Sequence, residues 1–274
     1  MICAWNAFLR ILPVWMRQEV DRLGRDTMLE LRLRCDAPPE LILADGNRWL
    51  SKKVTAEDLQ TCINAASMYS PWAAETASQG YITAPGGHRI GLCGEAVLRD
   101  GAVTGMRRTE SLCIRIARDY PEVCAGFPSD GSVLILGAPG WGKTTLLRSG
   151  ARLLAEKETV AVVDERGELY PPGFARGRRM DVLTGCPKTE GIERLLRTMG
   201  PQYVAVDEIT ARQDCEALLH AVGCGVRLLA SAHASSMEDF LSRSVYHPLV
   251  ERNVFDHILL LNRRRTWREE RRRA

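Results

Sequence analysis

The chain has 274 residues, of which 45% are apolar and 26% are charged, and its formal net charge is +3. These values are typical of a soluble globular protein with one large domain or two modest ones, and a charge this small does not by itself indicate a nucleic-acid partner. Nine cysteines occur without a C-x-x-C spacing, which argues against a disulfide framework and a zinc ribbon and favours a reducing cytosol.

The N-terminal segment is apolar but does not have the features of a membrane or export signal. No stretch of the chain reaches the roughly 18–20 apolar residues that a membrane-spanning helix needs. The first 16 residues carry Arg10 and Pro13 and lack a basic start and a small-residue cleavage site, so we do not expect a signal peptide. Their apolar face predicts a helix packed on a core, although a helix on a membrane surface has the same pattern. The face consists of Ile2, Trp5, Phe8, Leu9 and Leu12.

The first 120 residues mix strand and helix patterns, which predicts a smaller α+β domain over residues 1–120. Residues 28–34 alternate apolar and charged side chains, as a half-buried strand does, and a second strand is expected at 40–43. A helix is expected from Thr55, because acidic residues follow it at once. Later elements are expected as a helix over 74–79, strands over 81–84, 88–97 and 111–117, and a hairpin turn at Asp100-Gly101.

Residues 118–131 contain two prolines and two glycines and predict a linker, after which a second domain covers residues 121–262. In this domain strand patterns alternate with helical ones. This alternation predicts an α/β fold with a parallel sheet, here a RecA-like P-loop NTPase. The strands are expected at 132–136, 159–163, 203–208, 226–233 and 257–261, and the helices at 146–154, 191–199, 214–222 and 237–245.

A phosphate-binding loop of the G-x-x-x-x-G-K-[S/T] type stands between the first of these strands and the first helix. Its glycines let successive backbone amides surround phosphate oxygens, and the helix that follows adds its positive dipole end. Lys143 is expected to contact the β and γ phosphates, and Thr144 to hold Mg²⁺. A chance glycine-rich turn is the weaker interpretation, because both flanking elements are present. The residues expected to bind ATP are Gly137, Ala138, Pro139, Gly140, Trp141, Gly142, Lys143, Thr144 and Thr145.

An apolar strand pattern that ends in Asp207-Glu208 fits the Walker B motif. Asp207 would hold Mg²⁺, usually through water, and Glu208 would act as the general base on the attacking water. Alone this motif is weak, but together with the phosphate loop it predicts Mg²⁺-dependent ATP hydrolysis. The chain has no N-K-x-D element that would select guanine, which favours ATP.

Two further groups of polar residues are expected at the same edge of the sheet. Ser231 and His233 end the strand expected between the Walker A and Walker B strands, so His233 would face the γ-phosphate as a catalytic residue; capping of a strand or helix is equally compatible. Asp164, Glu165 and Glu168 follow the second strand. They could steer Mg²⁺ or water, contact a neighbouring subunit, or form a solvated acidic loop.

The C-terminal tail, residues 263–274, concentrates positive charge: residues 263–273 hold seven arginines against two glutamates, a local charge of +5. A run of this kind is expected to be solvated and disordered, although contact with an anionic membrane or a nucleic acid has the same signature. Trp267 is its single aromatic residue, and neither domain interleaves aromatic and basic side chains in a way suited to stacking bases. A nucleic-acid partner is therefore not favoured.

With these motifs the sequence resembles the stage III sporulation protein AA family of endospore-forming bacteria, from about residue 10 to residue 261. The resemblance implies an ATPase of the mother cell, related to the hexameric ATPases of type II and type IV secretion and pilus assembly. It further implies membrane-embedded sporulation channel proteins as partners, a homo-oligomeric ring, and a cytoplasmic protein peripheral to the membrane. The segments that carry it are residues 30–34, 89–97, 111–118, 137–145, 162–168, 181–188, 206–209 and 232–233.

The resemblance also implies roles for single residues. In the secretion ATPases an acidic cluster after the second strand and a histidine after Walker B are functional, and Asp164, Glu165 and His233 stand at those places. The tail after Leu261 departs from the family pattern. The related ATPases complete their site with arginines of the N-terminal domain, for which the candidates are Arg89, Arg115 and Arg118.

Two alternatives to a motor ATPase stay open at this point. One is a nucleic-acid-stimulated RecA-like ATPase, which the arginine-rich tail motivates. The other is a nucleotide-gated scaffold that scarcely hydrolyses ATP, against which Glu208 argues.

Overall fold

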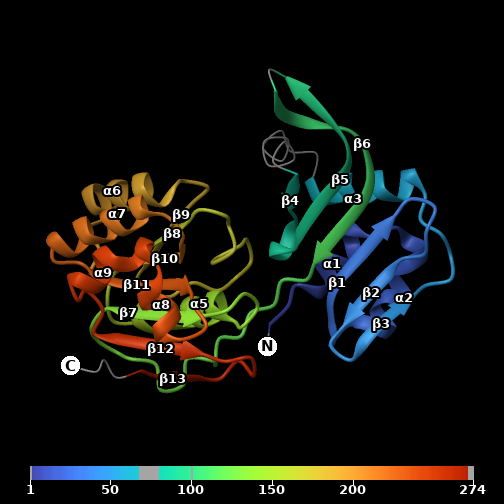
Figure 1. The fold of residues 1–274 in the computed structure, drawn as a ribbon. Coiled ribbons are helices and arrows are strands. Elements are labelled where there is room, and N and C mark those ends of the chain that lie inside the picture. Colours follow the sequence, from blue (N-terminus) through green and yellow to red (C-terminus); the bar gives the residue numbers. More distant parts are fainter. Residues whose placement is uncertain (1, 68–79, 100, 271–274) are drawn as a thin grey trace. The chain divides into compact units, whose positions relative to one another are not determined.

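The computed structural model describes residues 2–67, 80–99 and 101–270 (Figure 1). The chain divides into two compact units, one formed by Met1–Asp119 with Pro171–Phe174 and the other by Tyr120–Tyr170 with Ala175–Ala274. The chain thus passes from one unit to the other at Asp119 and Tyr120, beside the domain boundary expected near residue 120. The helix expected over residues 74–79 lies outside the described residues.

The first unit is built on a six-stranded antiparallel sheet in the order β3-β2-β1-β6-β5-β4. A single apolar core joins this sheet to α1, α2 and α3. The strands are β1 (Met28–Arg34), β2 (Glu40–Leu43), β3 (Gly46–Trp49), β4 (Tyr81–Thr83), β5 (Arg89–Arg99) and β6 (Ala102–Arg115), and the helices are α1 (Trp5–Ile11), α2 (Val14–Gly24), α3 (Ala56–Ser67) and the 3₁₀ turn η1 (Pro85–Gly87).

The N-terminal helix packs into this core. Trp5, Phe8 and Ile11 of α1 are buried, and the Trp5 indole donates a hydrogen bond of 2.6 Å to the Asp21 carboxylate of α2. Because the protein itself covers these three side chains, they are not available to a membrane surface. Of the strand expected at 111–117, residues 111–115 form the last part of the longer strand β6, which pairs with β5 along its whole length.

The second unit is an α/β domain whose seven-stranded sheet runs β13-β12-β7-β11-β10-β8-β9 (Figure 1). All neighbouring strands are parallel except β12 and β13. The carboxyl ends of β7, β11, β10 and β8 therefore meet at one edge of the sheet, where ligands bind in such folds. Its strands are β7 (Val133–Gly137), β8 (Val160–Asp164), β9 (Met180–Thr184), β10 (Tyr203–Ile209), β11 (Arg227–His233), β12 (His257–Leu261) and β13 (Trp267–Glu269). Its helices are α5 (Lys143–Leu154), α6 (Lys188–Met199), α7 (Arg212–Gly223), α8 (Met237–Ser242), α9 (His247–Glu251) and the 3₁₀ turn η2 (Ser244–Tyr246).

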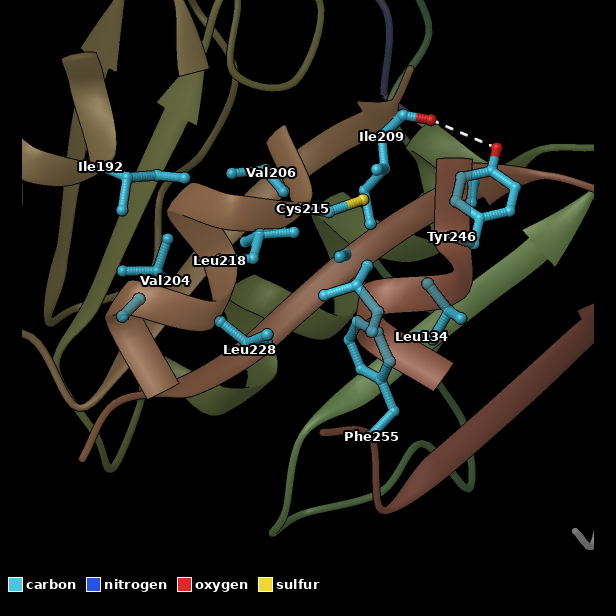
Figure 2. Close-up of a cluster of buried hydrophobic side chains, with 14 of the residues drawn as sticks. Leu134, Ile192, Val204, Val206, Ile209, Cys215, Leu218, Leu228, Tyr246 and Phe255 are labelled. Carbon is cyan, nitrogen blue, oxygen red and sulfur yellow. Dashed lines mark hydrogen bonds between the residues drawn. The ribbon is translucent and has the colours of Figure 1, made fainter. Parts of the chain in front are cut away.

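Two apolar clusters cover the two faces of this sheet, because successive strand residues point to opposite sides. Leu134 and Val204 belong to the cluster with α6 and α7, which Figure 2 shows. Ile135 and Tyr203 belong to the cluster with α5. Because both faces are buried, the sequences of the central strands are continuous runs of apolar residues.

Three strands were not expected from the sequence: β3 in the first unit, and β9 and β13 in the second. β9 is half-buried at one edge of the sheet, and its mixed composition gives no strong strand pattern. β13 lies within the arginine-rich tail, so the expectation that residues 263–274 are disordered is wrong for the part that the structure describes. Trp267 pairs with Leu261 of β12 and packs on the apolar cluster of α5. This partly buried side chain gives the tail an apolar contact that its composition alone did not indicate.

Candidate functional site

The phosphate loop connects the carboxyl end of β7 to the first turn of α5. Gly140 and Gly142 adopt φ values of +77° and +98°, the left-handed region that only glycine enters without strain. No side chain caps the N-terminus of α5. The first amide groups of this helix are therefore free to bind an anion, as its dipole favours.

Lys143 opens α5 and points its ammonium group back across the loop. Its Nζ lies 3.3 Å from the carbonyl oxygen of Ala138 and 2.9 Å from the imidazole Nδ1 of His233. Burial lowers the pKa of Lys143, and the nearby carboxylates of Asp207 and Glu208 oppose that shift. A charge held in this setting interacts strongly with a phosphate, because little water screens it.

Thr144 and Asp207 bring two oxygen ligands together. The Thr144 hydroxyl donates a hydrogen bond of 2.6 Å to Oδ2 of Asp207, while the Ser231 hydroxyl donates to Oδ1. Burial raises the pKa of Asp207, against these two hydrogen bonds. A hydroxyl next to a desolvated carboxylate is a donor set that fits Mg²⁺, which prefers oxygen ligands.

Glu208 occupies a distorted position at the end of β10. The pairing of β10 with β11 shifts register between Val206 and Ile209, and Glu208 has a φ of +52°. A bulge of this kind turns a side chain out of the strand's regular alternation, and the backbone strain is typical of functional positions. The Glu208 amide donates to the Ser231 hydroxyl at 2.9 Å, which holds the bulge in place.

The carboxylate of Glu208 is held between two nitrogen groups. One oxygen lies 3.1 Å from Nε2 of His233, and the other lies 3.0 Å from Nη1 of Arg166. His233 thus contacts Lys143 through Nδ1 and Glu208 through Nε2. His233 was expected either to face the γ-phosphate or to cap a strand or helix. Its side chain bridges Lys143 and Glu208, the two charged groups of the site, which is more than a cap would do.

The acidic residues after β8 do not form one solvated loop. Asp164 is 3% exposed, and its carboxylate accepts hydrogen bonds of 2.9 Å from the amides of Glu168 and Tyr170. Burial raises the pKa of Asp164. Glu165 instead forms an ion pair with the buried ammonium group of Lys188. Asp164 shapes the loop, and the solvated interpretation is wrong for this residue.

This loop and the end of β10 line one small polar pocket, whose walls include Arg166, Lys188 and Glu208. The sequence placed Ser231 at this edge of the sheet but not its hydrogen bonds to Asp207 and to the Glu208 amide, and it gave no role to Arg166 or Lys188. The available signal for Arg166 was a cation directly after two acidic residues.

Each of the three arginines considered for completing the site has a contact within the first unit. The guanidinium of Arg89 lies 4.2 Å from the centre of the Tyr81 ring, and Arg115 lies 3.6 Å from the Glu30 carboxylate. Arg118 donates hydrogen bonds to backbone carbonyl groups of the same unit.

Across the described ranges we find no helix with the length and apolar character needed to cross a bilayer.

The chain is similar to known proteins over nearly its whole length. The family model described as "Sporulation stage III, protein AA" matches residues 6–269. The stage III sporulation protein AA of Bacillus subtilis (strain 168) is 36% identical over 279 residues, which cover 94% of this chain and 91% of that protein. The protein SEEDLING PLASTID DEVELOPMENT 1 of Arabidopsis thaliana is 27% identical, but the match spans 34% of its length and 86% of this chain.

Solved structures show the same fold at low sequence identity. The ATPase DotB of Legionella pneumophila superposes with a TM-score of 0.59 at 18% identity and covers 92% of this chain and 76% of its own. The pilus retraction motor PilT, solved with bound ADP, gives a TM-score of 0.61 at 15% identity and covers 95% and 78%. The expected fold class is thereby confirmed. The chain belongs to the sporulation stage III protein AA family, and it has the fold of the ATPases DotB and PilT.

Proposed function

We propose that the protein is a Mg²⁺-dependent ATPase that acts as a ring-forming motor or assembly ATPase on a membrane complex during sporulation. The observation that supports hydrolysis best is the chain of contacts from Lys143 through His233 to Glu208, next to the Thr144–Asp207 pair. Five side chains from β10, β11 and α5 converge there, which binding of a phosphate alone would not require.

Each of these side chains has a chemical role in the proposal. Bound Mg²⁺–ATP would supply a polarised terminal phosphate, with Thr144 and Asp207 as the residues that hold the metal. Lys143 and the uncapped first turn of α5 neutralise phosphate charge. Glu208 accepts the proton of the attacking water, and His233 orients the Glu208 carboxylate.

The wider role rests on the family and the fold. A sporulation family member with the fold of a pilus retraction motor suits conversion of nucleotide turnover into work on a larger assembly. We propose membrane-embedded sporulation channel proteins as the partners, a homo-oligomeric ring that is hexameric, and a cytoplasmic location at the membrane through these partners. Arginines of the first unit would complete the site of a neighbouring subunit.

ATPase assays of two variants test the chemistry. Glu208→Gln keeps the size of the side chain and removes the base, so we expect ATP binding close to that of the parent protein and turnover reduced by about 100-fold or more. Lys143→Ala is expected to lose both binding and turnover. Arg212→Ala, at an exposed ion pair on α7, is the matched control and should keep both. Parent-level turnover by Glu208→Gln would refute the assignment of the base.

Mass measurement with a non-hydrolysable ATP analogue and Mg²⁺, with and without the membrane partner, tests the ring. The proposal expects a closed oligomer and a turnover that the partner stimulates. A monomer whose turnover the partner leaves unchanged would contradict it.

The nucleic-acid alternative rested on the arginine-rich tail, and part of that tail extends the sheet as β13. Salt-dependent binding of single-stranded nucleic acid that disappears on deletion of residues 263–274 would restore that alternative.

A further inference from the structure

Three consecutive arginines of the tail lie in the turn between β12 and β13, and this turn is next to the phosphate loop. β12 runs parallel to β7, with Leu260 paired to Leu136. A Cβ placed on Gly137, the first residue of the phosphate loop, would lie 3.2 Å from Cβ of Leu261. The chain therefore leaves β12 at the edge of the sheet where the phosphate loop begins, as the adjacent positions of β7, β12 and β13 in Figure 1 illustrate.

The turn has a defined conformation. The Asn262 side chain accepts the amide of Arg264 at 2.8 Å and donates to the Thr266 hydroxyl at 2.6 Å. The Arg265 amide donates to the Asn262 carbonyl at 2.9 Å, and Arg265 has a φ of +62°. On the far side of the turn, Trp267 anchors β13 to the apolar cluster. The hydrogen bonds of the turn thus fix the backbone position of Arg265.

Arg265 is the arginine that faces the phosphate loop. A Cβ placed on Gly142 would lie 4.0 Å from Cγ of Arg265. Arg265 is exposed, and within residues 2–67, 80–99 and 101–270 its guanidinium has no hydrogen-bond or ion-pair partner. Arg268, two residues into the following strand, is by contrast paired with Glu270. The turn consequently presents an unneutralised guanidinium beside the loop that would bind phosphates.

The order of the strands indicates which end of a nucleotide this group would meet. Asp207, Glu208 and His233 lie on β10 and β11, to one side of β7, whereas β12 and β13 lie to the other side. A nucleotide whose terminal phosphate is directed at Glu208 has its α-phosphate and nucleoside on the side of the arginine turn. A guanidinium is the side chain best suited to pair with a phosphate there.

We propose that Arg265 is a nucleotide-binding residue of its own subunit, pairing with the α-phosphate of bound ADP or ATP. The inference rests on the proposed function, since it requires a nucleotide in the phosphate loop. It gives the arginine-rich tail a role at the ATP site, in cis.

Calorimetric titration of the full chain with Mg²⁺–ADP and Mg²⁺–ATP tests the proposal. Arg265→Ala is expected to lower the affinity for both nucleotides by about tenfold, because an ion-paired hydrogen bond is lost and both nucleotides have an α-phosphate. Arg265→Lys keeps the charge and should recover part of the loss. Arg252→Ala is the matched control. Arg252 is exposed and precedes His257, where β12 begins, at the end of the strands away from the phosphate loop. The variant should bind both nucleotides like the parent protein.

The outcomes separate the two proposals. Parent-like binding by Arg265→Ala, a loss confined to ATP, or an Arg265→Lys variant as weak as Arg265→Ala would each overturn the α-phosphate contact while leaving ATP binding by the parent protein intact. A folded parent protein that binds neither nucleotide would overturn the proposed function and this inference together. Thermal unfolding without nucleotide, with Arg265→Gly as a second variant that accommodates the left-handed backbone, tests the integrity of the turn. If Arg265→Gly unfolds like the parent protein and still loses nucleotide affinity, the proposal is supported; if it binds like the parent protein, the proposal is overturned.

Discussion

Ser231 makes the sharpest test of how the site is assembled, because its hydroxyl supports both acidic residues. It donates to the Asp207 carboxylate and accepts the Glu208 amide, and it is fully buried. Ser231→Ala removes the donor to Asp207 and leaves the amide of the bulged Glu208 without its acceptor. The residue contacts neither phosphate nor the reacting water in the proposed function, so the variant changes the position of the acidic groups and not their identity.

The expected magnitude follows from the hydrogen bonds lost. A hydrogen bond to a charged group is worth about 1.5–3 kcal/mol, and an unsatisfied buried amide costs about 1–3 kcal/mol. If about 1.4 kcal/mol of this loss falls on the metal-binding geometry of Asp207, the Mg²⁺ concentration for half-maximal ATPase activity rises about tenfold. We also expect kcat to fall, because Glu208 is no longer held in its strained position.

The assay is ATPase activity as a function of Mg²⁺ concentration, with thermal unfolding measured in parallel. Ser132→Ala is the matched control, because the Ser132 hydroxyl is likewise buried and accepts the Leu228 amide at 3.0 Å, but before the start of β7. Both variants should lose stability, and only Ser231→Ala should change the Mg²⁺ requirement. Ser231→Ala with the Mg²⁺ dependence and kcat of the parent protein would refute the positioning role.

Other predictions concern the rest of the fold. Gly150→Ala in α5 should destabilise the protein by about 1–3 kcal/mol, because the new Cβ would lie 2.5 Å from the Phe127 ring. Gly223→Ala, with open space near the end of α7, should be neutral or stabilising, and equal unfolding temperatures for the two variants would contradict the packing argument. Burial lowers the pKa of His88 from its usual 6.5. Its stabilising contribution is therefore complete above pH 6.5 and is lost as the pH falls through the lower folded-state pKa; unfolding midpoints at pH 7.5 and 5.5 should show a loss that His88→Gln reduces. Asp164→Ala removes the acceptor of two loop amides and should speed proteolytic cleavage between residues 165 and 170; an unchanged cleavage rate would count against its structural role.

The sequence was sufficient for the elements whose signal is local. The phosphate loop needs glycines at fixed spacing between a strand and a helix, and in the structure β7 ends at Gly137 and α5 begins at Lys143. The buried parallel strands are continuous apolar runs, so their places along the chain could be predicted. The position of His233 on a strand between those of Walker A and Walker B was also expected, from the strand order of such folds, and the sheet has that order.

The tertiary structure alone decided what the polar residues do. The bridge of Ser231 to Asp207 and to the Glu208 amide depends on a register shift between β10 and β11, which no local pattern encodes. Whether Asp164 is solvated or buried depends on the path of the loop after β8. The tail is the clearest case: its composition predicts a charged, disordered end, but pairing of β13 with β12 and packing of Trp267 on the apolar cluster of α5 place Arg265 beside Gly142. Charge and periodicity are properties of neighbouring residues, whereas the contacts of Ser231 with Asp207 and of Arg265 with Gly142 join residues more than 20 positions apart, and only the folded chain brings them together.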